Sequence, residues 1–243
     1  MKNFLCKKVN VSSYNVDFNK NLTLPACMGI FQDIADDHGK KIGADRATLL
    51  KTSNAFWVIT KVKLQINEFP KLNDKLNVET WTIDNTKVKF ERDCCIASNK
   101  KPLINIKTEW VALDMATRLI RPAKTLNFPF KMKNRSTRAV IQDFTNFTQS
   151  VSQEDFCYGR TIYSSDIDVN NHVNNCYYSR FVLDCFSVEF LQNNKLTEYE
   201  IHFLKECKEG EKLSFYKKQL SSNTYYVEAR VEDRVIIKVL LKF

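Results

Sequence analysis

The chain has 243 residues, a length that suits one large domain or two small ones. Hydrophobic residues make up 44% of it and charged residues 27%, a composition that excludes a mainly disordered protein. The net charge of +9 comes from scattered basic residues without an RNA-binding aromatic motif, so we expect a solvated basic surface and no nucleic-acid partner.

In the first half, an extended run precedes one predicted helix and four predicted strands. The run covers residues 9–17, and apolar residues within 24–34 then recur at spacings of three and four, which predicts a helix. Thr23 is its expected N-cap, and Gly39 with Gly43 can end it. Alternating apolar residues next predict strands over 56–66, 75–83, 87–97 and 103–113, with hairpin turns at 84–85 and 99–100.

The periodic pattern stops and then starts again in the second half. Residues 131–154 are rich in polar residues and are expected to link two domains, residues 1–130 and residues 155–243. The second domain is predicted to have an extended run over 156–163, a helix around 178–186, and strands over 196–203, 212–220, 225–231 and 235–241. We therefore predict an α+β fold in which each half is a long helix wrapped by a curved antiparallel sheet.

A short segment before each predicted helix shows a repeat. Residues 17–22 align with residues 168–173 at a constant offset, 168 − 17 = 151. Two copies of such a unit can pair their sheets edge to edge, so we interpret the chain as a built-in dimer. A homodimer of the whole chain is left open.

Cysteine and glycine usage excludes several classes of site. The eight cysteines lie within apolar runs and form no Cys-x-x-Cys pair, and the chain has three histidines, so we expect reduced thiols and no metal site. With five glycines, the chain has no dinucleotide fingerprint, phosphate loop or Gly-x-Ser-x-Gly elbow. No apolar stretch reaches the roughly 18 residues of a membrane span and no signal peptide is recognisable. We expect a cytoplasmic protein with no cofactor and no membrane partner.

The two copies of the repeat differ in their capacity for proton transfer. The second copy has Asp168, Asn170 and His172, whereas the first has Asn21 where the second has the histidine. Histidine can accept and return a proton, a carboxylate can attack or activate water, and an amide can donate to an oxyanion. Alternate residues of an extended turn can face one pocket. These residues therefore suit acyl-transfer hydrolysis, although they could equally shape a turn and cap the helix.

Several segments of the chain together form a specific pattern: a long signature in the second half, a later Glu-Cys pair, and ordered segments in the first half. These segments are Asp168-Val169-Asn170-Asn171-His172-Val173-Asn174-Asn175, Glu206-Cys207, Tyr14-Asn15-Val16-Asp17, Leu24-Pro25, Trp57-Val58-Ile59-Thr60-Lys61, Phe69-Pro70-Lys71 and Val78-Glu79-Thr80-Trp81. In these segments the sequence resembles the acyl-acyl carrier protein thioesterases of plants and bacteria.

The resemblance implies a tandem double hotdog fold that hydrolyses the thioester of fatty acyl-acyl carrier protein and releases free fatty acid. It carries over Asp168, Asn170, His172 and Glu206 as the catalytic group. Within such a family a carboxylate either attacks the thioester directly or positions water and histidine. We favour Asp168 and Glu206 activating water, His172 carrying the proton, and Asn170 with a backbone N–H at the helix start holding the oxyanion.

Cys207 is the alternative nucleophile, of the papain kind. The neighbouring Glu206 would raise the pKa of its thiol, so we interpret Cys207 as a packing residue. His38 and His202 are expected to make local hydrogen bonds or to lie at the surface.

The first half is expected to form the acyl-chain pocket, with Phe31, Ile34 and Trp57 as candidate substrate-binding residues. The alternative is that these large side chains belong to the hydrophobic core alone.

Two other functions remain as alternatives, an acyl-coenzyme A thioesterase or dehydratase and a non-catalytic acyl-binding module. Acyl carrier proteins are acidic, and the charge of +9 fits such a partner through electrostatic steering. Because the chain begins almost at the first predicted strand, we expect a soluble bacterial protein without the transit peptide and hydrophobic anchor of plant thioesterases.

Overall fold

The protein is described by a computed structural model over residues 4–129 and 134–243. The described residues fall into two compact units, the first within Met1–Leu22 and Gly29–Gln142 and the second within Thr23–Met28 and Asp143–Phe243. None of the helices in these residues has the length and hydropathy that crossing a membrane requires.

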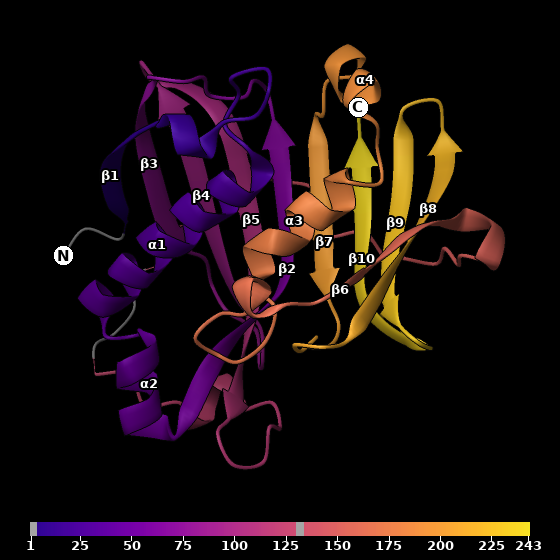
Figure 1. The fold of residues 1–243 in the computed structure, drawn as a ribbon. Coiled ribbons are helices and arrows are strands. Elements are labelled where there is room, and N and C mark those ends of the chain that lie inside the picture. The colour runs from indigo at the N-terminus through magenta and orange to yellow at the C-terminus, as the bar shows by residue number, and fades with distance from the viewer. Residues whose placement is uncertain (1–3, 130–133) are drawn as a thin grey trace. The chain divides into compact units, whose positions relative to one another are not determined.

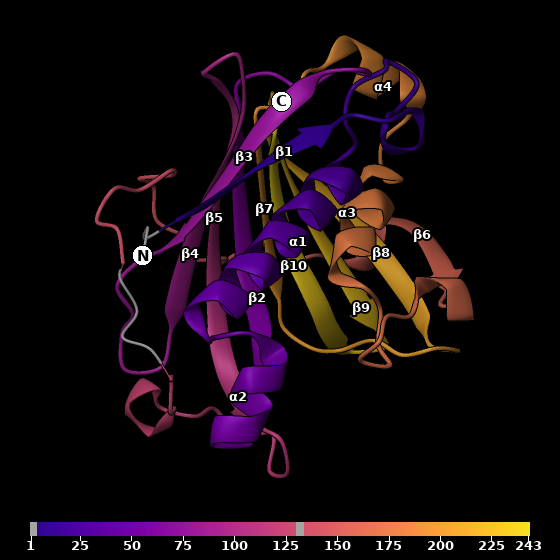
Figure 2. The same cartoon turned by 90° about the vertical axis from the view of Figure 1, so that its left-hand side faces the viewer.

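The first unit is a five-stranded antiparallel sheet with helices on one face. Its strands follow the order β1-β3-β4-β5-β2. Helix α1 crosses the face of β3, β4 and β5 (Figure 1), and the side view shows it lying against that face along most of its length (Figure 2). The elements are β1 (Leu5–Asn10), η1 (Ser13–Asn15), α1 (Leu24–Ile42), α2 (Arg46–Ser53), β2 (Ala55–Ile66), β3 (Lys75–Thr82), β4 (Phe90–Ser98), β5 (Lys101–Asp114) and η2 (Ala123–Thr125), with α1 belonging to this unit from Gly29 onward.

Helix α1 begins and ends at residues that the sequence marks. The Thr23 hydroxyl oxygen accepts a hydrogen bond from the Ala26 N–H at 3.3 Å, which confirms the predicted N-cap. The helix stops at Gly43, whose φ of +65° is a left-handed conformation that glycine adopts without strain. Gly39 lies inside the helix, where an added Cβ would come within 3.3 Å of the Asp45 Cα. It therefore permits a close approach of the following loop rather than ending the helix.

The second unit repeats the strand order of the first, β6-β8-β9-β10-β7. Helix α3 lies across its sheet (Figure 1), so the predicted combination of a helix and an antiparallel sheet is confirmed in both units. The elements are η3 (Gln153–Asp155), β6 (Phe156–Thr161), η4 (Ser164–Asp166), α3 (Asn175–Leu183), α4 (Val188–Asn193), β7 (Glu198–Phe203), β8 (Lys212–Ser221), β9 (Thr224–Val231) and β10 (Arg234–Lys242).

Strand pairing confirms the repeat and defines its registers. In the first unit Asn10 of β1 pairs with Lys75 of β3, and in the second Thr161 of β6 pairs with Lys212 of β8. The offset is 161 − 10 = 151 for the first strands, as the sequence indicates, and 212 − 75 = 137 for the second. The second unit is therefore 14 residues shorter, 151 − 137, between the start of its helix and its second strand. Equivalent positions are related by an offset of 151 before this difference and by an offset of 137 after it.

Two short helices were absent from the sequence-based prediction. Helices α2 and α4 have 8 and 6 residues, too few to show a clear apolar stripe. Their caps were visible in the sequence, since Asp45 accepts from the Thr48 N–H at 3.1 Å and Ser187 accepts from the Phe190 N–H at 3.1 Å. Cap residues without a periodic run behind them were not enough to predict a helix.

The predicted linker, residues 131–154, packs on charged residues of the sheets. Residues 131–133 lie outside the described part of the chain, and the remainder divides between the units after Gln142. In the first unit the Ala139 N–H donates to the buried carboxylate of Asp93 at 2.7 Å. In the second unit the Thr145 N–H and hydroxyl donate to the buried carboxylate of Glu200 at 2.6 and 2.9 Å. The segment thus supplies hydrogen bonds that these carboxylates need.

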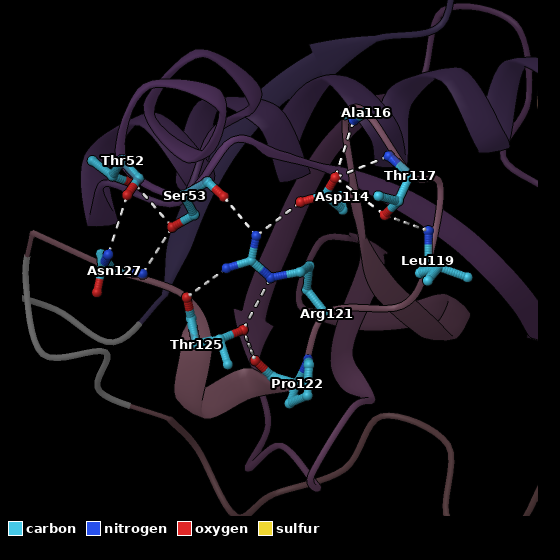
Figure 3. Close-up of polar contacts among 10 residues, drawn as sticks. All are labelled: Thr52, Ser53, Asp114, Ala116, Thr117, Leu119, Arg121, Pro122, Thr125 and Asn127. Carbon is cyan, nitrogen blue, oxygen red and sulfur yellow. Dashed lines mark hydrogen bonds and ion pairs between the residues drawn. The ribbon is translucent and has the colours of Figure 1, made fainter.

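A polar network around Arg121 fixes the chain after β5 to the end of α2 (Figure 3). The Arg121 guanidinium donates to the Ser53 carbonyl at 3.1 Å, to the Asp114 carboxylate at 3.0 Å, and to the Thr125 carbonyl at 3.1 Å. The Asn127 N–H donates to the Ser53 hydroxyl at 2.8 Å. One planar side chain therefore joins three segments beside a hydrophobic cluster that includes Leu49, Ala55, Phe90, Ala112 and Leu126.

Replacing Arg121 by lysine tests this network. Because a lysine ammonium cannot reproduce the forked geometry, we expect Arg121→Lys to lower the free energy of unfolding by about 1 to 3 kcal/mol. Lys124→Ala, an exposed substitution in the same turn, is the control and should change stability by less than about 0.5 kcal/mol. Denaturant unfolding measures both variants, and equal stabilities would contradict the proposed contribution of Arg121.

Candidate active site

A tight loop places Asp168, Asn170 and His172 at the start of α3. The loop is closed by an isolated antiparallel bridge between Ile167 and Val173. Within it the Asp168 N–H donates to the His172 carbonyl at 3.0 Å. Asn171 has a φ of +61°, a left-handed conformation that asparagine tolerates better than most residues. The loop backbone therefore fixes the relative positions of the aspartate and the histidine.

The Asp168 carboxylate is held by Asn170. Its Oδ1 accepts from the Asn170 backbone N–H at 2.7 Å, and its Oδ2 accepts from the Asn170 side-chain amide at 3.1 Å. Both oxygens of the carboxylate are thus engaged by one neighbour. This arrangement orients the carboxylate and leaves the second N–H of the Asn170 amide to donate elsewhere.

A second segment brings Glu206 to the same place. The Val173 N–H donates to the Cys207 carbonyl at 2.9 Å, which joins the loop to residues 204–211. From β10, Arg234 donates to the Glu206 carbonyl at 2.7 Å and forms an ion pair with Glu211. The arginine, which the sequence alone did not single out, therefore holds the backbone that carries the glutamate.

His172 lies between the two carboxylates. Its Nδ1 is 3.9 Å from Asp168 Oδ1 and its Nε2 is 3.8 Å from Glu206 Oε1. These distances exceed a hydrogen bond, as is common for catalytic pairs in the absence of substrate. The imidazole is about one-fifth exposed, so solvent and substrate can reach it. All four residues of the expected catalytic group thus meet within the second unit.

The equivalent loop of the first unit has the same backbone and keeps the aspartate, as Asp17, but has no histidine. The Asp17 N–H donates to the Asn21 carbonyl at 2.9 Å, matching the bond between Asp168 and His172. The Leu22 N–H donates to the Pro70 carbonyl at 2.7 Å, matching the bond between Val173 and Cys207. The offset of 137 then makes Phe69 the counterpart of Glu206, since 206 − 69 = 137. The first unit therefore lacks both the histidine and the glutamate.

A buried aspartate next to the loop was missed by sequence reasoning. Asp166 is 2% exposed, accepts from Arg160 at 2.7 Å, and lies 3.7 Å from Arg180. Its carbonyl accepts from the Asn174 N–H at 2.9 Å, at the N-cap of α3. Asp166 thereby joins β6 and α3 next to the loop that carries Asp168 and His172. The counterpart of Asp166 in the first unit is Asn15, a difference that comparing the two halves could have revealed.

Cys207 has the surroundings of a packing residue. Its side chain is fully buried, and burial raises the pKa of its thiol to about 12, with a further contribution from its hydrogen bond to Glu211. At neutral pH such a thiol is protonated, which makes it a poor nucleophile. The carbonyl of Cys207, rather than its sulfur, takes part in the site.

The other two histidines make local hydrogen bonds, in agreement with expectation. His38 Nδ1 lies 2.8 Å from Arg92 Nη1, and burial, aided by the arginine charge, lowers the pKa of His38 to about 4. His202 Nε2 lies 2.7 Å from the Glu200 carboxylate. Across the described residues, no group of three His, Cys, Asp or Glu side chains is arranged to hold a metal ion.

A cavity of about 380 Å³ lies in the first unit, within the size range of ligand pockets. Trp57 borders it, and its indole N–H donates to the Ala44 carbonyl at 2.8 Å. Phe31 packs against Trp110, which also borders the cavity, with ring centroids 6.4 Å apart. Ile34 is buried on the same face of α1 and precedes Ala35, another lining residue. Of the three candidate substrate-binding residues, Trp57 lines the cavity directly, whereas Phe31 and Ile34 lie next to residues that line it.

Comparison with known proteins agrees with this architecture. The acyl-ACP thioesterase N-terminal domain matches residues 2–126, and the C-terminal domain of the same family matches residues 152–239. An acyl-ACP thioesterase from Bacteroides thetaiotaomicron superimposes with a TM-score of 0.90 at 22% identity, covering 99% of this chain and 98% of that one. The 12:0-ACP thioesterase from Umbellularia californica gives 0.85 at 16% identity, covering 100% and 97%.

Curated plant sequences are similar over part of their length. A chloroplastic palmitoyl-acyl carrier protein thioesterase from Gossypium hirsutum is 24% identical over 228 residues, which cover 88% of this chain and 55% of the cotton protein. The chain thus spans about half the length of the curated relatives it matches. With the superpositions, the repeated helix and sheet identify a tandem hotdog fold. Because the two family domains match nearly the whole chain in order, this protein belongs to the acyl-ACP thioesterase family.

Proposed function

We propose that this protein hydrolyses the thioester of fatty acyl-acyl carrier protein and releases free fatty acid. The observation that carries the proposal is the position of His172 between two carboxylates, 3.9 Å from Asp168 and 3.8 Å from Glu206. A non-catalytic binding module would have no need of this arrangement, and the first unit keeps the same loop without it. Family membership supports an acyl thioester as the substrate.

The chemistry begins with a water molecule beside His172. Asp168 and Glu206 position the water, and His172 takes its proton as the oxygen attacks the thioester carbonyl carbon. The two carboxylates stabilise the positive charge that the ring then carries. Direct attack by Asp168 is disfavoured because both of its oxygens accept hydrogen bonds from Asn170.

The second half of the reaction breaks the carbon–sulfur bond. The second N–H of the Asn170 amide and a backbone N–H at the start of α3 donate to the oxyanion of the tetrahedral intermediate. When the intermediate collapses, the thiolate of the carrier leaves with the proton that His172 holds. The products are a free fatty acid and the carrier thiol, and the residues return to their starting protonation states.

The acyl chain is proposed to bind in the first unit, with Phe31, Ile34 and Trp57 contributing to its pocket. The cavity next to Trp57 supports this role because aromatic and aliphatic side chains, among them Ile42, Phe90 and Trp110, form part of its lining, with polar and charged side chains forming the rest. Burial of a methylene group contributes about 0.8 kcal/mol. Each added carbon should therefore strengthen binding until the chain meets a wall.

The charge and the thiols support a cytoplasmic setting. The eight cysteines, all within the described residues, are present as thiols and not as disulfides, which supports a reducing compartment such as the cytoplasm. The net charge of +9 favours rapid association with an acidic carrier protein. We propose acyl carrier protein as the partner on this basis.

The choice between carrier protein and coenzyme A requires both thioesters of one acyl chain. We expect a higher kcat/KM for the carrier-protein thioester, and we expect its advantage to shrink as salt screens the charge attraction. Steady-state kinetics at low and high ionic strength measure both effects. A higher kcat/KM for the coenzyme A thioester would favour the acyl-coenzyme A thioesterase alternative, and no hydrolysis of either would favour a binding module.

Substitutions at equivalent positions of the two units test the catalytic group. We expect His172→Ala and Asp168→Ala each to lower kcat by at least about a hundredfold, because proton transfer and its electrostatic support are lost. Asn21→Ala, at the counterpart of His172, is the matched control and should retain near wild-type turnover. Cys207→Ser should also retain most activity. A folded Cys207→Ser variant as inactive as His172→Ala would restore the thiol as nucleophile.

The acyl-length profile tests the pocket residues. We expect Trp57→Ala to move the preferred chain length upward without changing the chemical step, because the wall recedes while the catalytic residues stay in place. Phe31→Ala and Ile34→Ala should act in the same direction if they support that wall. Hydrolysis rates for chains of about eight to eighteen carbons measure the shift. A uniform loss at every length, with a lower melting temperature, would assign the residues to the core alone.

A further inference from the structure

A cation lines the cavity of the first unit without a carboxylate beside it. Arg92 of β4 is one of the lining residues; its Nη1 lies 2.8 Å from His38 Nδ1 and donates to the Thr80 hydroxyl at 3.3 Å. Because His38 belongs to α1, this contact places the guanidinium on the side of the sheet that the helix covers. Among the described residues, Nε and Nη2 of Arg92 have no hydrogen-bond partner, and no carboxylate forms an ion pair with it.

The neighbouring histidine supplies no counter-charge. His38 is 2% exposed, and burial, with the charges of Arg92 and Lys41, lowers its pKa to about 4, so the imidazole is neutral at pH 7. Its Nδ1 therefore accepts from Arg92. Burial also lowers the pKa of Arg92, to about 10, which leaves the guanidinium charged at neutral pH. A half-buried positive charge with unused N–H donors is costly unless an acceptor meets it.

Four carboxylates line the same cavity, and none of them neutralises Arg92. Two are exposed on α1, and the other two are half-buried and accept hydrogen bonds from Thr48 and Arg138. These residues are Asp33 and Asp36, then Asp45 and Glu91. The charge of Arg92 is therefore available to a ligand in the cavity.

The second unit has an aromatic residue at the equivalent position. Thr82 of β3 pairs with Arg92 of β4. The counterpart of Thr82 is Gln219, since 219 − 82 = 137, and Gln219 pairs with Tyr225 of β9. Tyr225 packs against three aromatic rings, those of Phe186, Phe190 and Phe243. The repeated fold thus forms without a cation at this point, which indicates that Arg92 serves the first unit alone.

From this geometry we propose that the cavity of the first unit binds an aliphatic chain that carries a carboxylate, with Arg92 as the partner of that carboxylate. Nε and Nη2 lie on one edge of a guanidinium, and this edge can donate to both oxygens of a carboxylate. Trp57, Phe90 and Trp110 would contact the chain. The inference rests on the proposed function in taking this cavity as the acyl pocket.

Two ligands share this chemistry. One is the released fatty acid, which would return to the cavity with its carboxylate toward Arg92 and act as an inhibitor. The other is an acyl group whose far end carries a second carboxylate, as in the monothioester of a dicarboxylic acid, which Arg92 would select as a substrate. Both put a chain and a carboxylate into the same cavity.

Isothermal titration calorimetry of the intact protein tests the shared chemistry. We expect the wild type to bind decanoate at least about tenfold more tightly than decanol, because hydrogen bonds between charged groups are stronger than those to a neutral acceptor. Arg92→Gln should bind the two ligands with similar affinity. Arg46→Gln, which removes an exposed cation from the lining of the same cavity, is the matched control and should keep the preference.

Two outcomes of the titrations would overturn the proposal. One is equal affinity of the wild type for decanoate and decanol, a result that needs no variant. The other is a folded Arg92→Gln protein that keeps the preference for decanoate.

Kinetics with two thioesters separate the two ligands. If the free acid is the ligand, decanoate should inhibit hydrolysis of a decanoyl thioester competitively, and about tenfold more weakly in Arg92→Gln. If the dicarboxylic acyl group is the ligand, the wild type should have a higher kcat/KM for the monothioester of decanedioic acid than for the decanoyl thioester, and Arg92→Gln should lose this preference. Hydrolysis with neither effect would overturn the inference and leave the proposed function intact. Decanoate binding through Arg92 without hydrolysis of any thioester would contradict the proposed function instead.

Discussion

One backbone hydrogen bond, from the Val173 N–H to the Cys207 carbonyl, holds the candidate active site together. It joins a loop that carries Asp168 and His172 to a segment that carries Glu206, although more than thirty residues separate them in the chain. Arg234 secures the same segment from β10. Because the bond is made by main-chain atoms, the side chains at this point are free to differ between the two halves of the molecule.

The two halves share the backbone geometry of this loop and differ in its side chains. Both loops keep the bridge, the left-handed residue and the carbonyl acceptor, so Lys20 has a φ of +60° where Asn171 has +61°. The histidine and glutamate occur in one copy, while the other has Asn21 and Phe69 at those positions. The first copy therefore lacks both of these side chains, and the cavity bordered by Trp57 lies in that copy.

Most of the fold could be predicted from the sequence because apolar residues that alternate or recur at helical spacing mark the buried faces of strands and helices. The long strands and α1 followed from these periods, and the turn at Asn99 and Lys100 was marked by its residue types and has positive φ at both. The four catalytic candidates came from a motif and from resemblance. The hydrogen bond from Arg234 to the Glu206 carbonyl could not be predicted, because it joins segments whose approach depends on the folded sheet.

A division of this protein into its two modules must keep the hydrogen bonds from Ala139 to Asp93 and from Thr145 to Glu200. A cut before Ala139 would deprive Asp93 of its backbone donor, and a cut after Thr145 would deprive Glu200 of two donors, even though neither cut would interrupt a helix or strand. Burial without those donors would leave each carboxylate costly to keep ionised. The segment between the repeats is therefore as much a part of each module as its strands, and a separable module must carry its own share of it.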